Sequence, residues 1–134
     1  MAGTDSTSSG SAHHKLVREA LADMDALTEL TTALRGDLDS YLADVEKSRR
    51  NIAGGGRASD MPTLFDVPVV RASLSDSLNA IERARARSRR SLWRLQIEEG
   101  LTIAEVARLW GFSRQLVSRA LAAGDKSVGA SGET

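Results

Sequence analysis

The side chains best suited to chemistry form an arginine run, ERARARSRR, between residues 82 and 90. Spacings of two and four residues spread the arginines over much of a helix surface, which suits contact with several backbone phosphates. Arg94 extends the set by one turn. The same run can also be a solvated face, or can pair with an acidic N-terminal segment, and both alternatives stay open. The run contains Arg83, Arg85, Arg87, Arg89 and Arg90; the neutralising candidates are Asp76 and Glu82 nearby, and Asp37, Asp39, Asp44 and Glu46 in the N-terminal segment.

Charge is distributed unevenly along the 134 residues, although the net charge is zero. Residues 1–70 contain 7 basic and 11 acidic side chains, whereas residues 71–126 contain 11 basic and 6 acidic ones. Binding to nucleic acid needs local positive charge rather than a positive total. The second half of the chain therefore favours a polyanionic partner.

Several kinds of chemistry have no support in the sequence. There is no cysteine, and the GGGR segment lacks the spacing and the ending of a phosphate-binding loop. His13 and His14 are adjacent without further ligands nearby, so they indicate a solvated helix start rather than a metal site. We expect no catalytic residue, no metal, no cofactor and no enzymatic activity. No run of 18 apolar residues and no apolar signal core are present, so a cytoplasmic protein without membrane contact is expected.

The segment LTIAEVARLWGFSRQLVSRALAA, residues 101–123, predicts two short helices and a tight turn. Thr102 and Glu105 have the spacing of a capping box, and Ser113 can cap the second helix. Gly111 can adopt the positive φ that ends the first helix. Apolar residues recur at helical spacing on both sides of the turn. They are Ile103, Val106, Ala107 and Trp110 in the first helix and Leu116, Val117, Ala120 and Leu121 in the second.

This segment resembles the helix-turn-helix of bacterial DNA-binding proteins. Ala107 stands where the family has a small residue at the helix crossing, Gly111 follows at the turn, and Val117 falls in the interhelical core. The resemblance covers roughly residues 89–123. It is closest to the three-helix form of resolvase-type recombinases and of the promoter-reading region of sigma factors. Trp93 and Trp110 are then expected in the core, and the polar residues 124–134 indicate no wing.

The resemblance implies that the second helix enters the major groove of DNA. Ser113 and Ser118 would bond phosphates or base edges, and Arg114, Gln115 and Arg119 would make bidentate base contacts. The arginines of the preceding helix, Arg87, Arg89, Arg90 and Arg94 among them, would bind the phosphate backbone.

Residues 15–53 carry apolar residues at the three- and four-residue spacing of a long amphipathic helix resembling a coiled coil. Its seam predicts a homodimer, and the alternative is that the helix folds back onto its own chain. Gly36 leaves open whether this arm is one helix or two antiparallel ones. The seam residues expected to dimerise are Leu27, Leu34, Leu38, Tyr41 and Val45.

Residues 54–73 predict a hinge, because three glycines and two prolines interrupt the helical pattern. The hinge contains an apolar patch that can pack locally or meet a partner. Ser73 or Ser75 would cap the next helix. The patch consists of Leu64, Phe65, Val67, Val69 and Val70.

The sequence thus predicts an all-α protein in five parts. Residues 1–14 form a disordered tail, 15–53 the helical arm, 54–73 the hinge, 74–124 the helix-turn-helix module and 125–134 a second disordered tail. The expected function is that of a sequence-specific, dimeric transcriptional regulator on double-stranded DNA, associated with the nucleoid. The alternative is a helical adaptor whose arm binds a protein such as polymerase, a sigma factor or a segregation factor.

Overall fold

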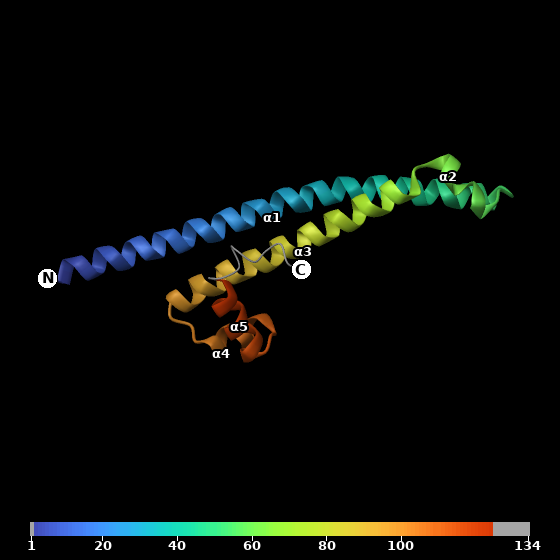
Figure 1. Cartoon of the computed structure of the whole chain (residues 1–134). Coiled ribbons are helices and arrows are strands. Elements are labelled where there is room, and N and C mark those ends of the chain that lie inside the picture. Colours follow the sequence, from blue (N-terminus) through green and yellow to red (C-terminus); the bar gives the residue numbers. More distant parts are fainter. Residues whose placement is uncertain (1, 125–134) are drawn as a thin grey trace. The chain divides into compact units, whose positions relative to one another are not determined.

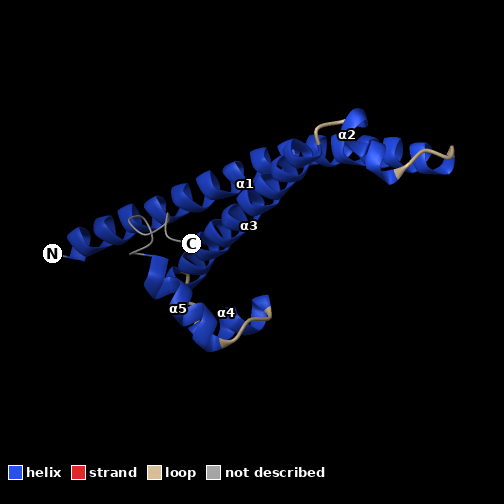
Figure 2. Ribbon diagram, turned by 45° about the vertical axis from the view of Figure 1, so that its right-hand side comes forward, coloured by secondary structure: helices blue, strands red, loops and turns tan. Residues whose placement is uncertain are grey.

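The structure, a computed structural model, describes residues 2–124. These residues contain helices and connecting loops and no strand, which confirms the all-α prediction (Figure 2). The tail predicted at 125–134 lies outside the described residues. The elements are α1 (Ala2–Ala53), a 3-10 turn η1 (Ala58–Asp60), α2 (Met61–Leu64), α3 (Val67–Glu98), α4 (Ile103–Trp110) and α5 (Arg114–Gly124).

The chain divides into two compact units. The terminal unit combines Met1–Asp25 with Ala86–Thr134, and the middle unit is Ala26–Arg85. Each unit contains part of α1 and part of α3, so the helical arm is shared between two packing environments. This division differs from the predicted one, which placed the arm and the C-terminal module in separate domains.

The arm is one helix, which decides between the two alternatives that Gly36 left open. A Cβ at Gly36 would meet nothing within 4 Å, so the glycine leaves no packing defect. The hydroxyls of Thr31 and Thr32 bond the carbonyls of Leu27 and Thr28, at 2.7 and 2.9 Å. Polar residues at these positions are therefore satisfied within the helix itself.

The helix begins at Ala2 rather than at Lys15, so it includes residues 2–14, for which the sequence predicts a disordered tail. Adding a residue to an existing helix gains a hydrogen bond, whereas the nucleus is the costly step. Serine and threonine lower helix stability by only about 0.5 kcal/mol each. A Ser/Thr-rich end can therefore continue a helix that begins to pack at His13.

The predicted hinge is shorter than expected, because α3 begins at Val67 and not near Ser73. The Asp66 carboxylate accepts a hydrogen bond from the amide of Val69 at 3.2 Å, which caps the new helix. Pro68 stands in the first turn, where its missing N–H costs no helical hydrogen bond. In the sequence, Pro68 is interpreted as an interruption of the helical pattern, whereas in the structure Pro68 lies in the first turn of α3.

In the middle unit, the apolar patch of the former hinge packs against α1. Phe65, Val67 and Val70 line one groove of about 390 Å³ together with Tyr41 and Val45. Ser77 donates a hydrogen bond of 2.5 Å to Asp37 on the antiparallel helix. In this unit the arm therefore packs against its own chain. This is the alternative that the sequence left open beside a homodimeric coiled coil.

In the terminal unit, α1 and α3 also run antiparallel. His13 contacts Glu98 at 2.7 Å, and Ser91 donates a short hydrogen bond to Asp23. The residues buried between the two helices are small. They are Ala20 on α1 and Ser88 and Ser91 on α3.

The core of the terminal unit lies where α3, α4 and α5 meet (Figure 1). It is built from Trp93, Val106, Ala107 and Val117, each at most 3% exposed. The rings of Trp110 and Phe112 meet Trp93 edge to face, at centroid distances of 6.1 and 5.5 Å. The predicted core roles of both tryptophans are confirmed, since Trp110 packs against this cluster.

Candidate nucleic-acid interface

The turn between α4 and α5 is determined by three local features. Thr102 caps α4, with its hydroxyl accepting from the Glu105 amide at 3.1 Å and the Glu105 carboxylate accepting from the Thr102 amide at 3.2 Å. Gly111 adopts φ 75° and ψ 29°. Ser113 Oγ accepts from the Leu116 amide at 3.1 Å and begins α5. The predicted capping box, glycine turn and second cap are all confirmed.

The Glu105 carboxyl has a pKa below its ordinary value of 4.5. The main cause is the hydrogen bond from the Thr102 backbone, followed by that from the Thr102 hydroxyl, at 3.0 Å, and by the charge of Arg108. The charged carboxylate therefore belongs to the cap, and it stabilises the first turn of α4.

Helix α5 separates its residues into an inner and an outer face. Val117 is fully buried, and Leu116, Ala120 and Leu121 pack against the core. The outer face carries Arg114, Gln115, Ser118 and Arg119, all of them exposed. These four side chains and Ile103 line one shallow hollow on the surface. Four of the five residues predicted to meet DNA on this helix therefore share one open face, while Ser113 beside them is used as a cap.

The outer face of α5 has the right donors for nucleic acid. Arginine offers a planar fork of N–H groups to guanine or phosphate, and glutamine offers a donor and an acceptor to adenine. Arg119 lies back on its own helix, where Nε donates to the Gln115 carbonyl at 3.4 Å. Arg114 and Gln115 are therefore the side chains best placed to reach beyond the helix.

The arginine run on α3 is divided between the two units. Arg83 and Arg85 belong to the middle unit, and Arg85 pairs with Glu82 at 2.6 Å. This pair is the partly neutralised face that the sequence left as an alternative. The acidic residues of the arm have other contacts: Asp37 with Ser77, Asp44 with Lys47, and Glu46 with Arg49 and Arg50.

The arginines of the terminal unit differ in their surroundings. Arg87 is exposed, whereas Arg89, Arg90 and Arg94 are half-buried. The guanidinium of Arg89 lies over the rings of Trp93 and Phe112, 5.6 and 4.9 Å from their centroids. A cation held on aromatic faces contributes to packing. The structure thus gives Arg89 an internal contact that the sequence did not indicate.

Arg90 shows the electrostatic strain of this cluster. Its pKa is lowered, first by burial and then by the charges of Arg94, Arg87 and Arg89, while Asp23 acts in the opposite sense. The guanidinium remains charged, because arginine titrates far above neutral pH. Arg90 therefore stays cationic among like charges, with Asp23 as the opposite charge that acts on it.

The residues predicted to dimerise share one side of the helix but differ in exposure. Leu27 and Leu34 are half-buried, whereas Leu38, Tyr41 and Val45 are exposed to between 41 and 45%. Tyr41 and Val45 also line the groove against α3. The expected seam is therefore partly used within the chain.

Sequence reasoning missed the polar contacts that join distant segments. Trp110 Nε1 donates to Gln96 Oε1 at 3.0 Å and connects α4 to α3. The Ser91–Asp23 bond connects residues 68 positions apart. The only sequence signal for this bond was Ser91 itself, a small polar residue beside the arginine run, and it does not identify Asp23 as the partner.

Comparisons of the chain with protein-family models, with curated proteins and with solved structures give no match. Within residues 2–124, no helix combines the length and the apolar character needed to span a membrane.

Proposed function

We propose that the protein binds double-stranded DNA through α5 and acts as a sequence-specific transcriptional regulator, without enzymatic activity. In this proposal α4, the Gly111 turn and α5 work as a helix-turn-helix, with α5 in the major groove. The observation that carries it is the outer face of α5, where Arg114, Gln115, Ser118 and Arg119 are exposed together while Val117 is buried opposite.

Local charge supports the proposal. Residues 86–124 contain seven arginines and three glutamates, whereas the whole chain is neutral. Arg87 and Arg90 belong to the same unit as α5 and are proposed to contact phosphates. Phosphate contacts position a protein on the duplex, and contacts to base edges select the sequence.

The experiment is fluorescence anisotropy with the full chain and labelled duplexes, after selection of bound sequences from a random duplex pool. We expect one enriched motif and an affinity that falls as salt is raised, since each phosphate contact releases counterions. Enrichment without a motif would limit the function to non-specific binding. Absence of binding even at low salt would exclude the proposal and favour the helical adaptor.

A further inference from the structure

The middle unit buries very little. Among residues 26–85, all of which the structure describes, Ala84 is the one buried residue. A two-helix hairpin without a buried large side chain lacks the core that a stable domain needs. Something outside this hairpin is therefore required to cover its apolar surface.

That surface has a defined position on α1. Leu38, Leu42, Val45 and Ile52, here called the outer stripe, are 43 to 66% exposed. At 3.6 residues per turn they fall within an arc of roughly 80°. The helix face toward α3 is different and more polar, since it carries Asp37, which bonds Ser77. The most apolar face of this helix segment is thus left open.

The stripe continues across the groove onto α3. Val45 forms one wall of the 390 Å³ groove and Leu74 forms another. Leu78 follows Leu74 by one turn, so the two share a helix face, and Leu78 is 45% exposed. Val69, which is 61% exposed, does not line this groove; it lines a neighbouring hollow with Asp37 and Ser40, which shares Leu74 and Val70 with the groove. The apolar face therefore comprises the outer stripe, the groove and Leu78.

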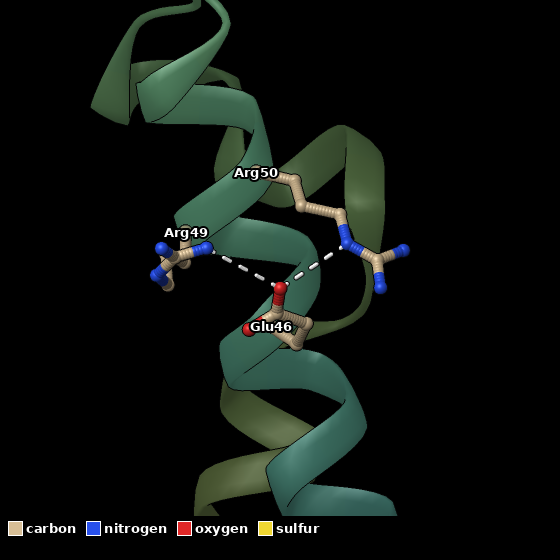
Figure 3. Close-up of polar contacts among 3 residues, drawn as sticks. All are labelled: Glu46, Arg49 and Arg50. Atoms are coloured by element: carbon tan, nitrogen blue, oxygen red, sulfur yellow. Dashed lines mark hydrogen bonds and ion pairs between the residues drawn. The ribbon is translucent and has the colours of Figure 1, made fainter.

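The one charged residue within the stripe, Arg49, contacts a carboxylate of its own helix. Around the helix, Arg49 falls between Val45 and Leu42 within this arc. Figure 3 shows Glu46 between Arg49 and Arg50, with Oε1 at 3.5 Å from Arg49 Nη1 and 3.2 Å from Arg50 Nε. This carboxylate offsets part of the positive charge that a partner would meet beside Arg49.

We propose that a second copy of this chain covers the face, with the two stripes antiparallel, so that two hairpins form a four-helix bundle. The middle unit has nine acidic and eight basic residues, so two copies do not repel each other. An antiparallel pairing places Leu38, at the start of one stripe, beside Ile52 at the end of the other, so that both stripes are covered along their whole length. One self-complementary patch is what a two-fold dimer needs.

This inference deepens the proposed function, because two tethered modules read DNA more tightly than one. The proposed interface differs from the seam predicted from the sequence, because it includes Leu42, Ile52 and Leu78 and leaves out Leu27 and Leu34. Association is measured without DNA, and Arg114→Ala, which removes a DNA contact, should leave it unchanged. Failure of the dimer and failure of DNA binding are therefore distinguishable.

The test is sedimentation equilibrium of the full chain beside Leu38→Asp/Leu42→Asp and the matched control Val69→Asp. We expect a wild-type dimer, a control that dimerises equally, and a stripe variant whose dissociation constant rises at least about tenfold per substitution. A monomeric wild type would overturn the inference and leave a different protein as the occupant. A stripe variant that dimerises like the wild type would overturn it as well.

Folding and orientation are tested by cross-linking, since the chain has no cysteine of its own. A mixture of Leu38→Cys and Ile52→Cys chains should form mixed disulfide dimers, whereas Ala43→Cys, on another face of α1, should not. These substitutions leave the apolar surface largely intact, so they report on a folded protein. The antiparallel arrangement would be overturned if disulfides formed between two Leu38→Cys chains but not between a Leu38→Cys chain and an Ile52→Cys chain.

Discussion

The guanidinium carbon of Arg89 lies 4.9 Å from the centroid of the Phe112 ring. This contact joins the basic stretch of α3 to the turn that precedes α5. Within the described residues, Nε of Arg89 is buried without a hydrogen-bond partner, so the aromatic rings are its principal contact. Arg87, two residues earlier, is exposed. Neighbouring arginines of one run thus have different surroundings.

The two arginines should therefore respond differently to substitution. Arg87→Ala should leave stability unchanged and reduce the salt slope of DNA binding by roughly one unit. Arg89→Ala should lower the free energy of unfolding by about 1–2 kcal/mol, because it removes a cation from two rings, with little change in slope. Anisotropy across a salt series and urea unfolding measure the two effects. Equal slopes for wild type and Arg87→Ala would contradict a phosphate contact at this position.

Base reading is predicted to concentrate on the outer face of α5. Arg114→Ala or Gln115→Ala should cost about 1–3 kcal/mol on the selected duplex and much less on a random one. Arg108→Ala, an exposed arginine on α4, is the matched control and should not discriminate between the duplexes. If Arg114→Ala weakens both duplexes equally, its contact is with phosphate alone.

The two helix glycines should give opposite results when replaced by alanine. Gly111 has φ 75°, so Gly111→Ala should destabilise the protein by about 1–2 kcal/mol, and Gly111→Asn by less. Gly36 is helical with open space around its missing Cβ, so Gly36→Ala should stabilise α1 by about 0.5–1 kcal/mol. Urea unfolding of the full chain provides both values. A neutral Gly111→Ala would mean that the turn does not need a left-handed residue.

Acid should weaken the cap of α4. The pKa of Glu105 is lower in the folded protein than its ordinary value of 4.5. The charged carboxylate therefore contributes stability that is present above that value and is lost as the pH falls through the folded-state pKa. The urea midpoints of wild type and Glu105→Gln should differ at neutral pH and converge in acid. A difference between the urea midpoints that stays constant from neutral to acid pH would show that the charge of Glu105 does not stabilise the cap. Arg108→Ala tests the smaller contribution of Arg108 to the lowered pKa of Glu105.

The sequence by itself determined the features that depend on neighbours along the chain. Thr102 with Glu105, Gly111 and Ser113 each act within one turn of helix, so residue type and spacing are sufficient to predict them. The core positions Val106, Ala107 and Val117 follow from helical periodicity for the same reason. The all-α class follows from the same local rules.

Tertiary structure decided what depends on residues far apart. Periodicity identifies an apolar stripe on α1 but not which flank of it meets α3, because both flanks have the same helical spacing. Arg89 could be identified as cationic from the sequence, but its position over Phe112 depends on the α3–α4–α5 packing. Pro68 is the instructive error: a proline breaks a helix from inside and begins one from its first turn. Pro68 begins a helix here for two reasons. Asp66 caps the first turn of α3, and Val67 and Val70 pack against α1.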